Sequence, residues 1–139
     1  MLFKAVPLRH GPQDVHISLQ PLCLIYAAFM VKHFLCDYPL QTAWMAKGKG
    51  TVTGWQAPLA AHAAMHAAGT LAIALATVPA LAWLAIVDLV VHGTVDRTKS
   101  CATRGMSPSQ PQFWWALGLD QGAHQATHFC FVIALLTQL

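Results

Sequence analysis

Two long stretches of this chain contain no basic residue. No lysine or arginine lies between Lys49 and Arg97, and none follows Arg104. Only 9% of the residues are charged and 56% are hydrophobic, whereas a typical soluble domain carries about 25% charged residues. Such a chain cannot cover a water-facing surface, so we predict an integral membrane protein rather than a soluble helical core. The net charge of +3 is spread over loops and indicates no nucleic-acid partner.

Proline and glycine divide the apolar sequence into four predicted helices. The helices cover residues 21–37, 58–77, 80–96 and 111–139. Each is near the roughly 20 residues that a helix needs to cross a bilayer. We therefore predict an all-α fold, a four-helix transmembrane bundle with up-down-up-down topology. Residues 19–139 form its single domain, and residues 1–18 form a flexible N-terminal extension.

Basic residues in the loops set the expected orientation. Lys47 and Lys49 follow the first predicted helix, and Arg97, Lys99 and Arg104 follow the third. In an up-down bundle both loops lie on one side, which the positive-inside rule assigns to the cytoplasm. We expect a multi-pass protein of the cell inner (cytoplasmic) membrane. Its expected partners are membrane lipid and further copies of the chain in a homo-oligomer.

Histidines and aspartates recur at a spacing of four residues within every predicted helix. Residues four apart lie on one helical face, one turn apart in height, so each pair can hold one ion. With alternating helix directions all the pairs reach one layer, which is how four-helix bundles hold metal ions. Asp88 and His128 lie one turn outside these pairs and are expected to orient ligands or to pack beside them. The expected metal ligands are His33, Asp37, His62, His66, His92, Asp96, Asp120 and His124.

The charge balance of these helices favours bound cations. An aspartate inside a bilayer costs roughly 2.5–3.5 kcal/mol and needs a partner. Lys32 is the one lysine or arginine inside a predicted helix, so the helical aspartates outnumber the cations expected to reach them. Eight ligands exceed the needs of one tetrahedral zinc and suit two divalent ions with open positions. Mixed imidazole and carboxylate ligation fits zinc, manganese, iron or nickel.

A pair of ions suggests a reaction. Two ions about 3.5–4 Å apart can activate water and hold both reacting oxygens of a phosphoester. This predicts a metal-dependent hydrolase of a phosphoester or lipid-like substrate, with Asp96 and Asp120 as candidate catalytic carboxylates. Lys99, one turn beyond Asp96, either binds the substrate phosphate at the membrane surface or serves as a positive-inside anchor.

Other functions are open at this stage. The same pairs suit a divalent-metal transporter, or a metal-binding membrane protein without catalysis. A di-iron or haem protein is a third alternative, although iron-binding bundles favour glutamate and this chain has none. A purely structural or partner-binding membrane protein is the fourth.

Several motifs also resemble a known family. HFLCDYPLQTAWMAKGK (33–49), the pair His62 and His66, HGTVDRTK (92–99) and DQGAH (120–124) are similar to small bacterial and phage membrane proteins grouped as domain of unknown function 3307. The resemblance extends from about residue 24 to the carboxyl end and implies no established activity. The chain is similar, more loosely, to membrane-bound metal-dependent hydrolases. The resemblance adds four groups that would orient ligands or contact substrate, namely Gln41, Lys47, Lys99 and Gln121.

Overall fold

Every regular element of the described chain is helical. The computed structural model describes residues 18–139, and no strand occurs within that range, so the prediction of an all-α fold is confirmed. The predicted extension, residues 1–18, lies outside the described residues except for Ser18. The elements are α1 (Leu19–Asp37), α2 (Ala43–Gly48), α3 (Gln56–Thr77), the 3-10 turn η1 (Pro79–Leu81), α4 (Leu84–Ala102) and α5 (Pro111–Leu136).

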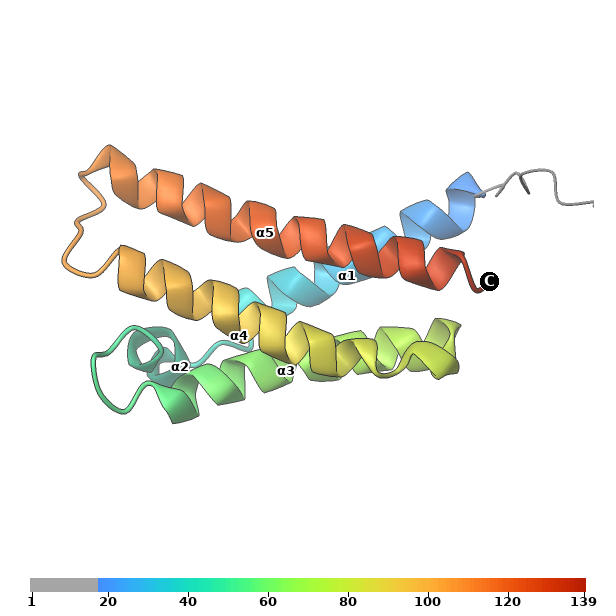
Figure 1. Cartoon of the computed structure of the whole chain (residues 1–139), viewed down its shortest axis with the longest axis horizontal. Coiled ribbons are helices and arrows are strands. Elements are labelled where there is room, and N and C mark those ends of the chain that lie inside the picture. Colours follow the sequence, from blue (N-terminus) through green and yellow to red (C-terminus); the bar gives the residue numbers. More distant parts are fainter. Residues whose placement is uncertain (1–17) are drawn as a thin grey trace, which may run out of the picture.

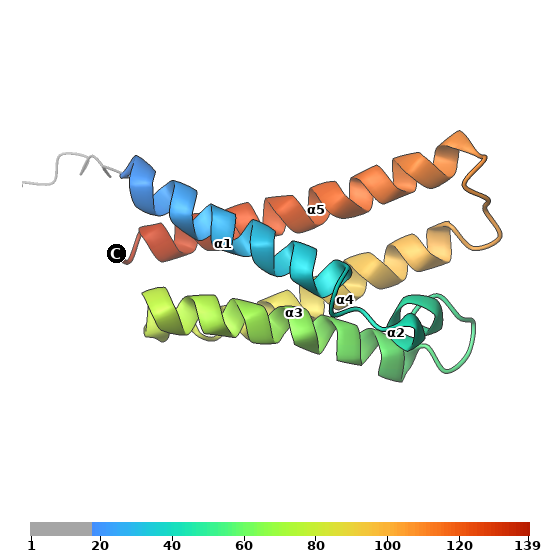
Figure 2. The same cartoon turned by 180° about the vertical axis from the view of Figure 1, so that it is seen from behind.

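The four long helices enclose one interior. Successive long helices run in opposite directions, and Figure 1 places α2 and the α4–α5 loop at one end, with η1 and the C-terminus at the other. α1 packs against α3 and α5, and α4 packs against the same two helices. Figure 2 shows that α1 crosses the other helices obliquely. Side chains from all four helices can therefore meet inside.

Three helical segments are long and apolar enough to cross a membrane. They are Leu19–Asp37, Gln56–Thr77 and Pro79–Ala102. α5 is longer but is not among them, because polar residues such as Asp120, Gln121 and Gln125 lower its hydropathy. Composition thus indicates a membrane protein with three apolar spans, one fewer than the sequence predicted. The position of α5 depends on what its polar side chains contact.

The boundaries of the helices follow local rules. Pro111 occupies the first turn of α5, where its missing N–H breaks no hydrogen bond. Thr42 caps α2 by accepting a hydrogen bond from the Met45 amide at 3.3 Å. α4 continues past Asp96, the predicted end, as far as Ala102. Lys99 therefore lies in its last turn, where the helix dipole favours positive charge.

An apolar core fills the end of the interior near η1. Its residues come from the first half of α1, the start of α4 and the last turns of α5, which alternating directions bring to one level. They are Ile25, Phe29, Leu84, Phe131, Val132 and Leu135, none more than 6% exposed. The other half of the interior, toward α2 and the α4–α5 loop, contains polar side chains. The bundle is therefore divided along its length into an apolar and a polar half.

Gly69 allows Lys32 to pass close to α3. A Cβ at Gly69 would overlap Cγ and Cδ in the Lys32 stem. This stem has little freedom to shift, because its ammonium is held by three buried partners. Gly118 on α5 is different, since a Cβ there would meet nothing within 4 Å. Both glycines lie within helices, so their alanine variants form a matched pair that differs in the space available to the Cβ.

We expect Gly69→Ala to destabilise the protein by about 1–3 kcal/mol, the usual cost of overpacking. Gly118→Ala should be neutral or stabilising by up to about 1 kcal/mol, because alanine is the better helix former. Thermal unfolding of both variants in the same detergent measures the difference. A Gly69→Ala protein as stable as Gly118→Ala would contradict the packing of Lys32 against α3.

Candidate metal centre

The predicted ligands meet in the polar half of the interior. Each long helix presents two of them on one face, and all except Asp37 are 5% exposed or less. They are His33 and Asp37 of α1, His62 and His66 of α3, His92 and Asp96 of α4, and Asp120 and His124 of α5. We call this set the polar layer.

Two groups of donor atoms in the polar layer are close enough to hold a metal ion. Within each group, one donor atom per residue lies within 4.8 Å of all the others. His92 belongs to both groups, so the two candidate sites are adjacent. One group is Asp37, His62, His66 and His92, and the other is His92, Asp96 and His124.

The His62 ring lies at the centre of the polar layer. Its Nε2 atom is 3.4 Å from Asp37 Oδ1, 3.3 Å from Asp96 Oδ2 and 3.2 Å from His92 Nε2. A single N–H can donate to only one of these neighbours. Ligands bound tetrahedrally at 2.0–2.1 Å from zinc lie about 3.3 Å apart. The spacing therefore matches ligands around an ion better than a set of hydrogen bonds.

Three imidazole rings form a stacked column. The ring centroids of His66 and His92 are 3.6 Å apart, and those of His92 and His124 are 4.1 Å apart. Positively charged rings at such distances would repel one another strongly in a buried site. Neutral rings avoid this repulsion, and neutral imidazole is the form that binds metals.

Asp120 and His124 present buried atoms that lack a hydrogen-bond partner. Among the described residues, neither Asp120 Oδ1 nor His124 Nε2 is hydrogen-bonded, and the two atoms lie 3.6 Å apart. Asp120 Oδ2 accepts a hydrogen bond from Gln121 Nε2 at 3.1 Å. Leaving a buried carboxylate oxygen unpaired is costly, so Asp120 Oδ1 is available to a partner that the described chain does not supply. The donor atoms of the polar layer thus fit a metal.

His33 lies at the edge of the polar layer. Its Nε2 atom is 3.1 Å from Asp37 Oδ2 and 3.2 Å from Gln121 Oε1, and His33 belongs to neither donor group. Gln41 places its amide nitrogen 3.2 Å from His62 Nδ1. These contacts suit side chains that hold the ligands in position.

Two lysines form ion pairs with aspartates, for which the sequence analysis expected too few cations. Lys32 Nζ lies 3.0 Å from Asp88 Oδ2, and Lys49 Nζ lies 2.6 Å from Asp96 Oδ2. The sequence analysis expected fewer cations than aspartates, and Lys49 is a loop lysine that does reach one of them. α2 packs back on α3, and Lys49, which follows α2, extends over the polar layer. The other two helical aspartates have no lysine partner among the described residues.

Lys32 is the centre of a second buried cluster, which we call the lysine cluster. Its ammonium contacts Thr70 Oγ1 at 3.2 Å, Asp88 Oδ2 at 3.0 Å and His128 Nε2 at 3.1 Å. Thr70 also donates to Asp88 Oδ2 at 2.6 Å. Each long helix supplies one member, and none is more than 7% exposed. Asp88 thus contacts lysine and threonine, rather than orienting a histidine ligand as the sequence suggested.

The lysine cluster adjoins the polar layer but is satisfied without a metal. The His128 ring lies 5.2 Å from the His33 ring, centroid to centroid, and stacks on Phe29 on its other side. All three ammonium hydrogens of Lys32 have an acceptor, which is the condition for burying such a charge. The sequence analysis noted Lys32 within an apolar helix but assigned it no site, and it missed Thr70 and the contact of Lys49 with Asp96.

A polar pocket of about 220 Å³ opens onto the polar layer. Residues from α1, α4 and α5 and the segment after α2 surround it. Lys47 is exposed and does not line it. Arg97 also lies outside the lining and stacks 4.0 Å from the Trp55 ring. The charged and amide side chains of the pocket are Asp37, Gln41, Lys49, Asp96, Lys99, Asp120 and Gln121.

The chain belongs to the family described as "Protein of unknown function (DUF3307)", which matches residues 25–139. The resemblance inferred from the motifs is confirmed for this family. No curated protein and no solved structure matches the chain. The looser similarity to metal-dependent hydrolases has no support from these comparisons. Because the family description names no activity, the functional argument depends on the geometry of the polar layer.

We expect the purified protein to bind a divalent metal, and His92→Ala to lose more of it than His33→Ala. His92 belongs to both donor groups and His33 to neither. Elemental analysis after equal exposure to zinc or manganese in detergent measures metal per chain. Cys101→Ala removes an exposed thiol and serves as the control with unchanged metal content. Equal metal in His92→Ala and the wild type would rule out this centre.

We expect Lys32→Met to cost about 3–5 kcal/mol of stability, because Asp88 is left buried without its cation. Adding Asp88→Leu should recover most of this loss, since an apolar pair can replace a buried ion pair. Chemical denaturation in detergent compares the single and the double variant. If the double variant is the less stable of the two, the ion pair does not hold these helices together.

Proposed function

We propose that the protein is a membrane-embedded hydrolase that uses two divalent metal ions to cleave a phosphoester near the cytoplasmic leaflet. The observation that carries the proposal is the sharing of His92 by two donor groups, which makes the two sites adjacent. Adjacent ions about 3.5–4 Å apart are the arrangement of many two-metal phosphoesterases. Zinc, manganese or iron suits the mixture of imidazole and carboxylate donors.

In this proposal all four long helices cross the inner membrane as an up-down-up-down bundle. α5 is the least apolar of them, but its ionisable residues Asp120, His124 and His128 are buried against the other helices. Inward-facing, partnered polar groups are the condition under which a helix can carry them through lipid. The outward positions Leu119 and Phe129 are exposed and apolar, as a lipid-facing surface requires. Membrane lipid then surrounds the bundle.

The charges of the polar layer suit an anionic substrate. With neutral histidines, its three carboxylates and Lys49 carry a net charge of about −2. Two divalent ions would change this to about +2, a charge that a phosphate monoester dianion balances. Lys99 lines the same pocket and adds attraction for an anion. A neutral substrate would leave this excess charge buried.

Asp120 is the best-placed general base. It lines the polar pocket, its Oδ1 atom has no hydrogen-bond partner among the described residues, and it lies outside both donor groups. Asp96, the other candidate catalytic carboxylate, belongs to a donor group and pairs with Lys49, so we assign it to metal binding.

The reaction follows from these roles. Bound ions would supply Lewis acidity toward the phosphoryl group. Asp120 takes a proton from water as the water oxygen bonds to phosphorus. The ester P–O bond breaks, and the leaving alkoxide takes the proton held by Asp120 to become an alcohol, which returns Asp120 to its carboxylate form. Lys49 and Lys99 hold the phosphoryl oxygens in the pocket.

Metal transport is the main alternative, and the distribution of polar groups argues against it. The apolar core closes the interior toward η1, whereas the polar pocket lies at the end near α2. A transport path needs access from both sides of the membrane. The described interior offers a polar opening to one side, which suits binding and catalysis better than passage.

We expect the protein to hydrolyse p-nitrophenyl phosphate in the presence of zinc or manganese, and to lose this activity reversibly with a chelator. Asp120→Asn should lower kcat by about 10²–10⁴ without lowering metal content, because it removes the base and leaves both donor groups. Lys47→Ala, outside the pocket, is the control with unchanged kinetics. Undiminished turnover by Asp120→Asn would remove Asp120 from the mechanism. A metal-loaded protein that hydrolyses no phosphoester would remove the proposed function.

A further inference from the structure

A cleft of about 300 Å³ separates α4 from α5 beside the polar pocket. Its wall on α4 extends from Thr94 to Ala102, about 12 Å at the rise of an α-helix. Its wall on α5 is formed mainly by Ala116, Leu119 and Ala123. Two further residues, Lys99 and Asp120, line both this cleft and the polar pocket. The cleft therefore adjoins the proposed reaction site and shares a wall with it.

The surface of the cleft is apolar although it contains two threonines. The Thr94 hydroxyl donates to the Val90 carbonyl at 2.7 Å, and the Thr98 hydroxyl donates to the Thr94 carbonyl at 2.8 Å. With both hydroxyls engaged by their own helix, the threonines offer methyl groups to a ligand. The cleft's charged groups are Lys99 and Asp120. Its chemistry matches an alkyl chain attached to a charged group.

Lys99 is available to bind the charged group. No carboxylate lies within salt-bridge distance of its ammonium among the described residues, in contrast to Lys32 and Lys49. Asp120 is 5% exposed, and its Oδ1 atom has no hydrogen-bond partner in the described chain. An anionic head group beside Lys99 would therefore lie within reach of the general base and of the polar layer.

We infer that the substrate is the phosphate monoester of a long-chain alcohol or lipid. Its chain lies in the cleft between α4 and α5, and its phosphate lies beside Lys99. This inference rests on the proposed function and defines the substrate class of the same site. The substrate enters sideways from the bilayer, so it does not have to leave the membrane to reach the polar layer.

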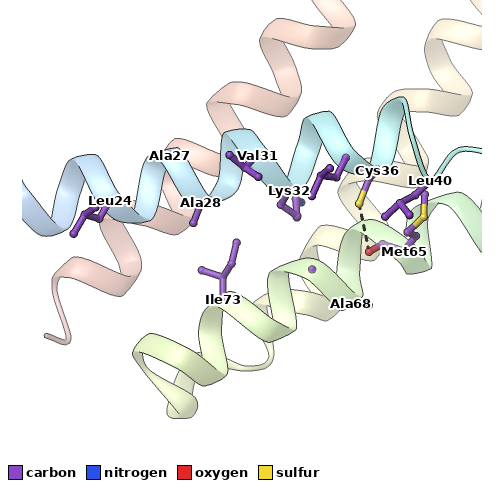
Figure 3. Close-up of a pocket in the computed structure, with 12 residues that line it drawn as sticks. Leu24, Ala27, Ala28, Val31, Lys32, Cys36, Leu40, Met65, Ala68 and Ile73 are labelled. Carbon is purple, nitrogen blue, oxygen red and sulfur yellow. Dashed lines mark hydrogen bonds between the residues drawn. The ribbon is translucent and has the colours of Figure 1, made fainter.

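An apolar groove between α1 and α3 provides a control surface. It has a volume of about 690 Å³ and lies between α1 and α3, where Figure 3 shows apolar side chains such as Ala28 and Ile73 along it. Lys32 lines it, but the Lys32 ammonium is bound to Asp88. The Cys36 thiol contacts the Met65 carbonyl at 3.8 Å. This groove offers no free charge to a head group. Lipid in the groove would therefore belong to the surrounding bilayer and would not be a substrate.

The first experiment compares hexadecyl phosphate with butyl phosphate on the metal-loaded protein in nanodiscs. We expect the wild type to favour the long chain in kcat/KM by about tenfold or more. Ala116→Trp and Ala123→Trp, which fill the cleft, should each remove about tenfold of kcat/KM for hexadecyl phosphate and change butyl phosphate by less than about twofold. Ala28→Trp fills the control groove and should change neither.

The second experiment measures binding without turnover. A diazirine-labelled hexadecyl phosphate is photolysed with the wild type, and mass spectrometry locates the labelled residues. We expect labels within residues 94–102 and 116–123, with fewer labels in Ala123→Trp. Labels along the α1–α3 groove alone, or a dimer in which the cleft is covered and unlabelled, would overturn the inference.

The two experiments separate the inference from the proposed function. Labelling of the cleft without hydrolysis of either phosphate would remove the hydrolase and keep the lipid site. Equal hydrolysis of both phosphates, unchanged by Ala116→Trp and Ala123→Trp, would keep the hydrolase and remove the lipid site. If both tryptophan variants fail to fold, the labels on the wild type decide between the cleft and the control groove.

Discussion

A charged side chain inside an apolar bundle must find a partner there, and this requirement organises the whole molecule. Each long helix has one face with ionisable groups, and the four faces meet in one interior. α5 depends most on this arrangement, because it is not apolar enough to qualify as a span alone. Its imidazoles gain partners when it packs against α1 and α4, since His128 contacts Lys32 and His124 lies 3.7 Å from Asp96. The polar contacts therefore fix which faces of the helices point inward, and the apolar core fills the remaining half of the interior.

The two buried clusters satisfy this requirement differently. In the lysine cluster the charges balance, because the Lys32 ammonium has three acceptors and the Asp88 carboxylate accepts from both Lys32 and Thr70. Adding a cation would break existing contacts. The polar layer is incomplete, since its carboxylates outnumber its lysines and several inward atoms lack a hydrogen-bond partner among the described residues. Buried polar groups without partners lower the stability of the folded protein, so such groups typically occur together where they bind a ligand. This contrast supports the proposal of a metal site in the polar layer and a structural role for the lysine cluster.

The sequence predicted the polar layer because its information is local. A spacing of four residues puts a pair on one helical face, and alternating helix directions then determine the common depth. The contacts between helices are not encoded in this way. Lys49 reaches Asp96 because α2 packs back on α3. No spacing rule within a helix predicts this contact. His33 has the same spacing as the other ligands, yet its contact with Gln121 keeps it outside both donor groups. Composition supports three of the four predicted spans, because α5 has the length of a span without a sufficiently apolar composition.

The level of the polar layer along the bundle also has a physical reason. A hydrolase that cleaves an amphiphile needs water on one side and an apolar environment for the chain on the other. Near η1 the apolar core would exclude water. Around Lys99 and Asp120 a polar pocket and an apolar cleft share a wall. Because these two residues face both environments, the phosphate of the proposed substrate would meet water and metal while its chain stays in the bilayer.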